Sequence, residues 1–131
     1  MAAQISVQIE GGDWHNGVPC FEPFQEIAGT VEVTVDRSVE CRQLAVRLMW
    51  HTEGSGDEDK ATVQEADIYQ GRLAPGYPVR GTFRLPLPGE PWSYTGNDVS
   101  IVWAIEVNVD VPMGQDLTHR EPLVVRPRAA R

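Results

Sequence analysis

The side chains of this sequence that could perform catalysis or bind a metal are few and dispersed. The chain has two cysteines, Cys20 and Cys41, and three histidines, His15, His51 and His119. Zinc sites usually combine a Cys-x-x-Cys step with a closely spaced histidine pair, and this sequence has neither. Because the ligand spacing is absent, we expect no metal site and no metal cofactor.

An acidic run, Asp57-Glu58-Asp59, has the composition of the start of a calcium-binding loop. With Asp57 as the first ligand, the sixth position is Thr62 rather than glycine and the twelfth is Ile68 rather than glutamate, so two requirements of an EF-hand fail. The Gly-Ser-Gly step at 54–56 lacks the Lys-Ser/Thr pair that follows the glycines of a phosphate-binding loop. This segment is therefore predicted to be a solvated acidic loop.

Nucleophilic and acid–base catalysis also lack a signature. Ser55 and Ser93 do not lie in a Gly-x-Ser-x-Gly elbow, the turn that exposes the catalytic serine of many hydrolases. Glu106 and Asp110 are separated by two pleat repeats, about 13 Å along an extended strand, which exceeds the carboxyl spacing of glycosidases. We predict no catalytic and no cofactor-binding residues, and hence a protein that is not an enzyme.

The element that would position Glu106 and Asp110 is the most regular segment of the chain, residues 98–111. Its odd positions are all apolar: Val99, Ile101, Trp103, Ile105, Val107, Val109 and Val111. Most even positions are polar, and side chains on a strand point alternately to opposite faces. The segment is thus predicted to be a long strand with one buried face, while Glu106, Asn108 and Asp110 occupy a solvated outer face.

Further segments share this two-residue period. They are residues 5–9, 27–35, 44–50, 79–87 and 123–125, with a weaker segment at 62–69, and turns rich in Gly and Pro separate them. No segment of helical length has a 3.6-residue apolar period, although a short helical turn at 57–66 stays open. The pattern predicts an all-β fold, a two-sheet antiparallel, immunoglobulin-like β-sandwich of about seven strands. We expect a single domain over residues 1–131, with a frayed basic tail at 126–131.

The aromatic residues are interpreted mainly as packing groups. Trp50 and Trp103 lie on apolar registers and are predicted to be in the core. Trp92 and Tyr94 lie in a turn before the long strand, and packing of that turn onto the end of the sandwich is favoured over an exposed recognition patch. Trp14 has loop-like neighbours and is the aromatic residue most open to a binding role.

The charge balance restricts the partners. The 131-residue chain has 19 acidic and 11 basic side chains, a formal net charge of -8. Nucleic acid and anionic membrane surfaces attract basic proteins, so we expect neither as a partner. Residues 1–13 have no basic start, and no run approaches the roughly 20 apolar residues of a membrane helix. We expect a cytoplasmic protein without membrane insertion. The reducing cytoplasm disfavours a Cys20–Cys41 disulfide, although the pairing stays open.

The order of several motifs resembles the arrestin-like β-sandwich family. The matching segments read EIAGTVEVTV, CRQLAVRLMWHTEGSG, GTFRLPLP, PWSYTG and NDVSIVWAIEVNVDVP, and the resemblance covers residues 5–125. The D-V-P-x-G-x-D ending at 110–116 is similar to that of the sporulation-control proteins and retromer subunits of this family. Gly29 and Gly81 lie on inward registers of two of these segments, where a glycine permits close backbone approach or a bulge.

The resemblance implies a non-enzymatic protein-interaction module, an adaptor or scaffold whose partner and binding residues stay unknown. Arrestins proper have two such domains and a basic phosphate-sensing site, whereas this acidic chain has no basic cluster outside its tail, so phosphate and receptor recognition are not carried over. The alternatives are a structural subunit of a larger assembly and, ranked lower, a metal-dependent enzyme or a small-ligand binder on a β-sandwich. Association with further copies of the chain stays open.

Overall fold

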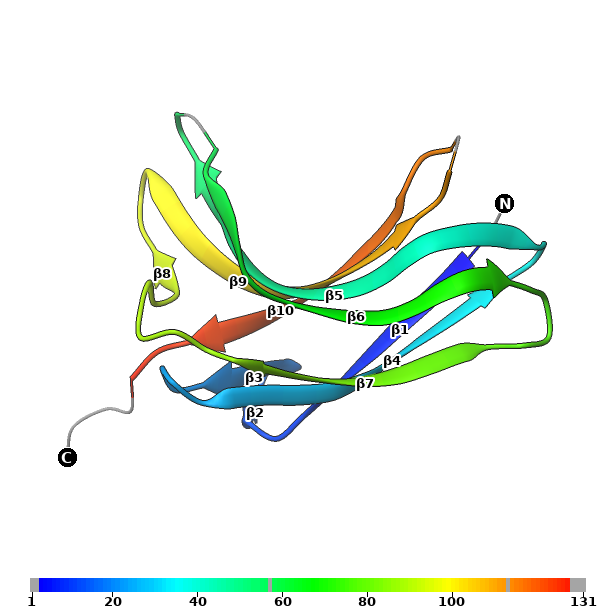
Figure 1. Ribbon diagram of the computed structural model, residues 1–131. Coiled ribbons are helices and arrows are strands. Elements are labelled where there is room, and N and C mark those ends of the chain that lie inside the picture. Colours follow the sequence, from blue (N-terminus) through cyan, green and yellow to red (C-terminus); the bar gives the residue numbers. More distant parts are fainter. Residues whose placement is uncertain (1–2, 57, 113, 128–131) are drawn as a thin grey trace.

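The computed structural model describes residues 3–56, 58–112 and 114–127, which form two packed β-sheets (Figure 1). The smaller sheet has the strand order β1-β4-β7, and the larger has the order β2-β3-β10-β9-β5-β6, with β8 paired to β9. The strands are β1 (Ala3–Glu10), β2 (Asp13–His15), β3 (Val18–Phe21), β4 (Glu26–Val35), β5 (Val39–Gly54), β6 (Lys60–Leu73), β7 (Val79–Pro86), β8 (Tyr94–Thr95), β9 (Val99–Asp110) and β10 (Leu117–Val125). The predicted all-β sandwich is confirmed.

Three details of the predicted sandwich differ from the structure. The described residues form ten strands rather than about seven, because the short strands β2, β3 and β8 were not predicted. Strand β3 pairs with β10 in parallel, at Val124↔Cys20, so the sandwich is not wholly antiparallel. No helical turn forms in the described part of 57–66, since β6 begins at Lys60 and pairs with β5, and this pairing overrides the local helix preference of the segment.

The apolar faces of the two sheets meet in one core. On β9, Trp103, Ile105, Val107 and Val109 are fully buried, as the alternation predicts. The neighbouring strand β5 adds Leu44, Val46 and Leu48 to this core, and the facing strands β4 and β7 add Ile27, Val31, Val33, Phe83 and Leu85. Trp50 is only partly buried and packs against this cluster, so its predicted core position is confirmed in part.

The opposite face of β9 corrects the prediction of a solvated surface. Asn108 is only 8% exposed, and the Glu106 side chain is only 12% exposed. Strand β9 lies between β5 and β10, whose long side chains cover it from both sides. Of the three residues predicted there, only Asp110 keeps substantial exposure, at 30% of its side chain.

The predicted role of the inward glycines is confirmed. A Cβ atom on Gly29 would lie 2.3 Å from the Gln8 carbonyl oxygen and 2.6 Å from Cζ of Phe83. A Cβ atom on Gly81 would lie 2.3 Å from Cγ2 of Ile68. At Gly29 the missing side chain thus lets the Phe83 ring lie directly on the backbone of the smaller sheet.

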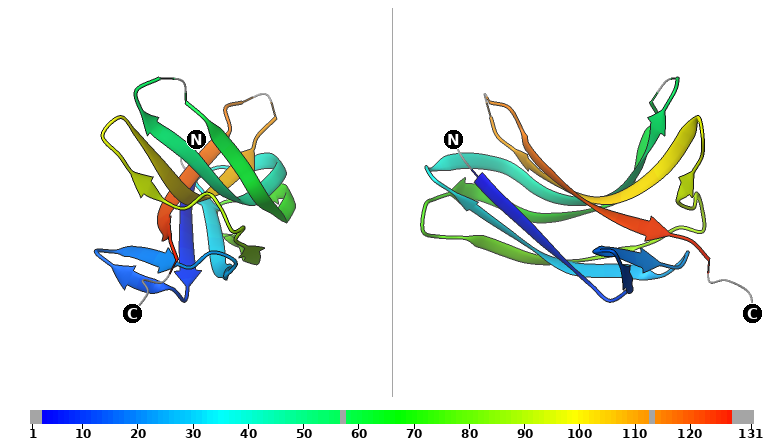
Figure 2. Two further views of the ribbon diagram at one scale, coloured as in Figure 1. Left: turned by 90° about the vertical axis from the view of Figure 1, so that its left-hand side faces the viewer. Right: turned by 180° about the vertical axis from the view of Figure 1, so that it is seen from behind.

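The larger sheet is strongly curved, and its outer face is concave (Figure 1). The β5–β6 and β9–β10 hairpins rise on the same side of this sheet and border the concave face at its two ends (Figure 2). The pairing of β5 with β6 contains three register shifts, and irregularities of this kind bend and twist a sheet. The fold therefore presents a hollow sheet face on one side and the flatter β1-β4-β7 face on the other.

The cysteines and the tail complete the comparison with the sequence. Both Cys20 and Cys41 are free thiols, and Cys41 is buried. At the start of the basic tail, the Arg126 amide donates to the Phe21 carbonyl, so this residue is held; residues 128–131 lie outside the described part. Among the described residues there is no helix with the length and apolarity of a membrane span.

Candidate functional site

A chain of ion pairs crosses the concave face on four neighbouring strands. Arg47 Nε lies 2.6 Å from Glu65 Oε2 and Arg47 Nη1 lies 3.4 Å from Glu106 Oε1, while Arg120 Nε lies 2.8 Å from Glu106 Oε2. The hydrogen bond that Arg47 donates to Glu65 is the main cause that raises the pKa of Arg47. The arginines are thus occupied by carboxylates of the chain itself, and Glu106 accepts from both of them.

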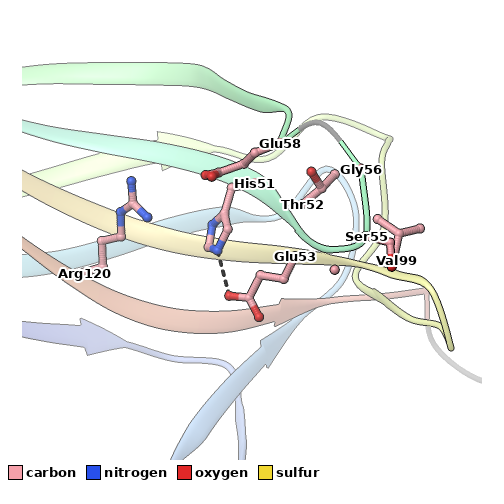
Figure 3. A pocket seen from close by; sticks show the side chains of 9 residues that line it. His51, Thr52, Glu53, Ser55, Gly56, Glu58, Val99 and Arg120 are labelled. Carbon is pink, nitrogen blue, oxygen red and sulfur yellow. Dashed lines mark hydrogen bonds and ion pairs between the residues drawn. The ribbon is translucent and has the colours of Figure 1, made fainter.

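One end of this face is hollowed into a depression of about 420 Å³ next to the β5–β6 hairpin (Figure 3). Its wall carries His51, Glu53, Glu58, Ser55 and Arg120. His51 Nε2 lies 2.9 Å from Glu53 Oε2, and the buried Nδ1 has no hydrogen-bond partner in the described structure. Ser55 is four residues from His51 on an extended chain, about 13 Å, so the two do not form a nucleophile–base pair.

The residues considered for metal binding are not brought together. His15 is on β2, His51 is on the concave face, and His119 lies on β10 on the register of the buried Leu123 and Val125. No group of three or more His, Cys, Asp or Glu side chains within the described ranges could hold a metal ion.

Two residues of the acidic run, Glu58 and Asp59, are described by the structure and lie between β5 and β6. Asp57 lies outside the described residues, Glu58 lines the depression, and Asp59 forms the hairpin turn with Thr52 through an amide-to-Oγ1 hydrogen bond of 2.8 Å. Ser93 is also structural, because its Oγ accepts from the Val125 amide at 2.9 Å.

The turn that contains Trp92 and Tyr94 is more open than predicted. Trp92 is 50% exposed and Tyr94 is 57% exposed, so packing onto the end of the sandwich covers only about half of each ring. Phe24, 79% exposed with a positive φ of 69°, lies against Gly89, whose carbonyl accepts from Trp92 Nε1. Trp14, 52% exposed, donates its Nε1 proton to the Gly11 carbonyl.

Strand edges are the other feature of this structure that can bind a partner, because an unpaired edge presents backbone N–H and C=O groups to any extended chain. The described sheets have five edge strands: β1, β2, β6, β7 and β8. Strands β2 and β8 have three and two residues, β6 has register shifts and several charges, and β7 carries Arg80, Arg84 and Pro86. Such features protect an edge against further pairing.

Strand β1 has none of these protective features. Its eight residues pair with β4 in one unbroken register, without a bulge or a proline, and its one charge is the terminal Glu10. Ile5, Val7 and Ile9 point toward the core, and Gln4, Ser6 and Gln8 are exposed. No hydrogen bond of the described chain reaches the free side of this strand.

A space of about 520 Å³ lies next to β1, lined by Ala3–Ser6 of that strand, by Glu32 and Thr34 of β4, and by His119 of β10. On β10, His119 Nε2 lies 2.8 Å from Glu121 Oε1, and both side chains are more than one third exposed. They share the inward register with Leu123 and Val125, which are fully covered. This polar pair thus lies between Leu117, which packs against the core cluster, and the buried Leu123.

The sequence is not matched by any family model or curated protein. The structure is similar to that of Spo0M, a sporulation control protein from Bacillus subtilis, with a TM-score of 0.74 over 98% of this chain. The chain has an arrestin-like fold. Sequence identity to Spo0M is 18%, and this chain covers 51% of it, about half its length. The resemblance read from the sequence is thus confirmed at the level of the fold.

The free edge and the His119–Glu121 pair were missed by the reasoning from sequence. The alternation at 5–9 predicts a strand but does not say which side of it stays unpaired. A usable signal was present: among the strand segments, this one combines regular alternation with no internal charge or proline, whereas the other long edges carry such residues.

Proposed function

We propose that this chain is a non-enzymatic protein-interaction module that binds an extended segment of a partner protein as an added strand beside β1. The observation that carries the proposal is the eight-residue edge of β1, which has no proline, bulge or internal charge and lies next to a space of about 520 Å³. Strand addition supplies affinity through main-chain hydrogen bonds and specificity through the alternate side chains. The free thiols of Cys20 and Cys41 support a cytoplasmic location for this binding.

The test uses proline at two neighbouring positions of β1. In an antiparallel strand, successive residues direct their backbone groups alternately to one neighbour and to the other. Of Ile5→Pro and Ser6→Pro, one therefore removes an N–H from the ladder with β4 and the other removes an N–H from the free edge. Denaturant unfolding identifies the edge variant as the one that keeps the wild-type stability more closely.

Binding is measured with peptides selected on the wild-type protein from a random twelve-residue phage library. We expect the selected peptides to shift the amide resonances of residues 3–10 and to lose most of their affinity for the edge variant, while Ser6→Ala binds as the wild type does. Peptides that bind the edge variant undiminished, or that map to the concave face, would refute strand addition at β1. Light scattering on the same samples tests the alternative of a structural subunit, for which the edge would pair with a second copy.

A further inference from the structure

The two edge strands of the β1-β4-β7 sheet are covered to different degrees on their inward faces. Val7, Val31 and Gly81 form one row across this sheet, because Val7 pairs with Val31 and Val31 pairs with Gly81. At the β7 end of the row, Ile68 of β6 occupies the place that a Cβ atom on Gly81 would take. Val31 in the middle is fully buried, whereas Val7 at the β1 end keeps part of its surface exposed. Along this row the core is covered at β7 and incompletely covered at β1.

The incomplete cover extends toward the start of β1. Ala3 and Ile5 pack against the core cluster but stay partly exposed, although Val33, the partner of Ile5 on β4, is fully buried. Of the inward residues of β1, Ile9 alone is buried. Ala3 and Ile5 are also among the residues that line the space of about 520 Å³ next to this strand. Partly exposed aliphatic surface therefore runs along the inward face of β1 from Ala3 to Val7.

A strand added beside β1 would direct every second side chain inward, next to Ile5 and Val7, because neighbouring strands share their faces. An aliphatic side chain at these positions removes its own surface and the remaining surface of Ile5 and Val7 from water, which favours binding. A charged or phosphorylated side chain would instead lose hydration against aliphatic groups. Resting on the strand addition proposed above, we infer that the partner segment carries aliphatic side chains, such as valine or isoleucine, at the alternate positions next to Ile5 and Val7.

The test compares two blocked eight-residue peptides of the same composition, four valines and four threonines, with the same two lysines appended for solubility. In one peptide valine and threonine alternate, so that an extended chain has one face of valine only. In the other they follow each other in pairs, so that both faces are mixed. Any two successive inward positions of the paired peptide include one threonine, whose hydroxyl finds no partner there. Because this substitution lowers affinity by about fivefold, we expect the alternating peptide to bind about fivefold more tightly in amide-shift titrations of the full chain.

Two matched variants locate the contact. Val7→Thr should weaken binding of the alternating peptide by about fivefold, for the same reason. Val79→Thr makes the same change at a partly buried inward position of β7, the other edge strand of this sheet, and should leave the affinity unchanged. Equal affinities of the two peptides, or equal effects of the two variants, would overturn the aliphatic partner while strand addition stands. If neither peptide shifts the amide resonances of residues 3–10, strand addition itself fails.

Discussion

Replacing Gly29 by alanine tests a close backbone approach inside the sandwich. The new methyl group would lie 2.3 Å from the Gln8 carbonyl oxygen on β1 and 2.6 Å from Cζ of the Phe83 ring on β7. Favourable contacts between heavy atoms begin at about 3.5 Å, so the atoms must separate by about 1 Å. One of the two obstacles is backbone, and the other is a ring that is only 3% exposed. Neither can rotate away.

The expected loss of stability follows from two opposing terms. Overpacking in a well-filled core typically costs about 1–3 kcal/mol, and we take about 3 kcal/mol because both contacts are fixed. Alanine in place of glycine restricts the unfolded chain and returns about 0.5–1 kcal/mol. The free energy of unfolding should therefore fall by about 2 kcal/mol, which lowers the melting temperature of a domain of this size by roughly 6–10 °C.

Guanidinium unfolding followed by tryptophan fluorescence measures this loss as a lower midpoint with an unchanged m-value. The control is Gly114→Ala, whose Cβ would make an ordinary contact of 3.4 Å with Val111 and should change the unfolding free energy by less than about 0.5 kcal/mol. Phe83→Leu in the Gly29→Ala background should recover part of the loss by removing one obstacle. A Gly29→Ala midpoint equal to that of the control would refute the steric reasoning.

Two further predictions concern titration and charge. Burial is the main cause that raises the pKa of the Cys41 thiol above its ordinary value of 9.0. The thiol therefore ionises at a lower pH in the unfolded chain than in the folded protein. The free energy of unfolding is retained below about pH 9 and declines as the pH rises toward the folded-state pKa. Cys41→Ala should show a smaller decline in denaturant midpoints between pH 8 and pH 10. Glu106→Gln leaves Arg47 and Arg120 without their shared carboxylate on a side chain only 12% exposed and should cost about 1–2 kcal/mol, whereas Arg72→Gln at an exposed pair should cost less than about 0.5 kcal/mol in the same assay.

The sequence by itself determined the faces of the strands. The alternation at 98–111 predicted that Trp103, Ile105 and Val107 are buried, and they are. It also predicted close approach at Gly29, where the structure places a carbonyl and a ring. These features are local, since the direction of a side chain on extended backbone depends only on its position along the strand. The motif order further indicated the arrestin-like fold, although no family model matches the sequence.

The tertiary structure alone decided which polar groups are covered and which edge is free. Glu106 became nearly buried because Arg47, 59 residues away, and Arg120 lie on the strands that flank it. The free side of β1 follows from the sheet order, and sheet order depends on pairings such as Glu10↔Ala28 that join distant parts of the chain. The two-residue period carries no information about such partners, because it fixes the faces of a strand and not its neighbours.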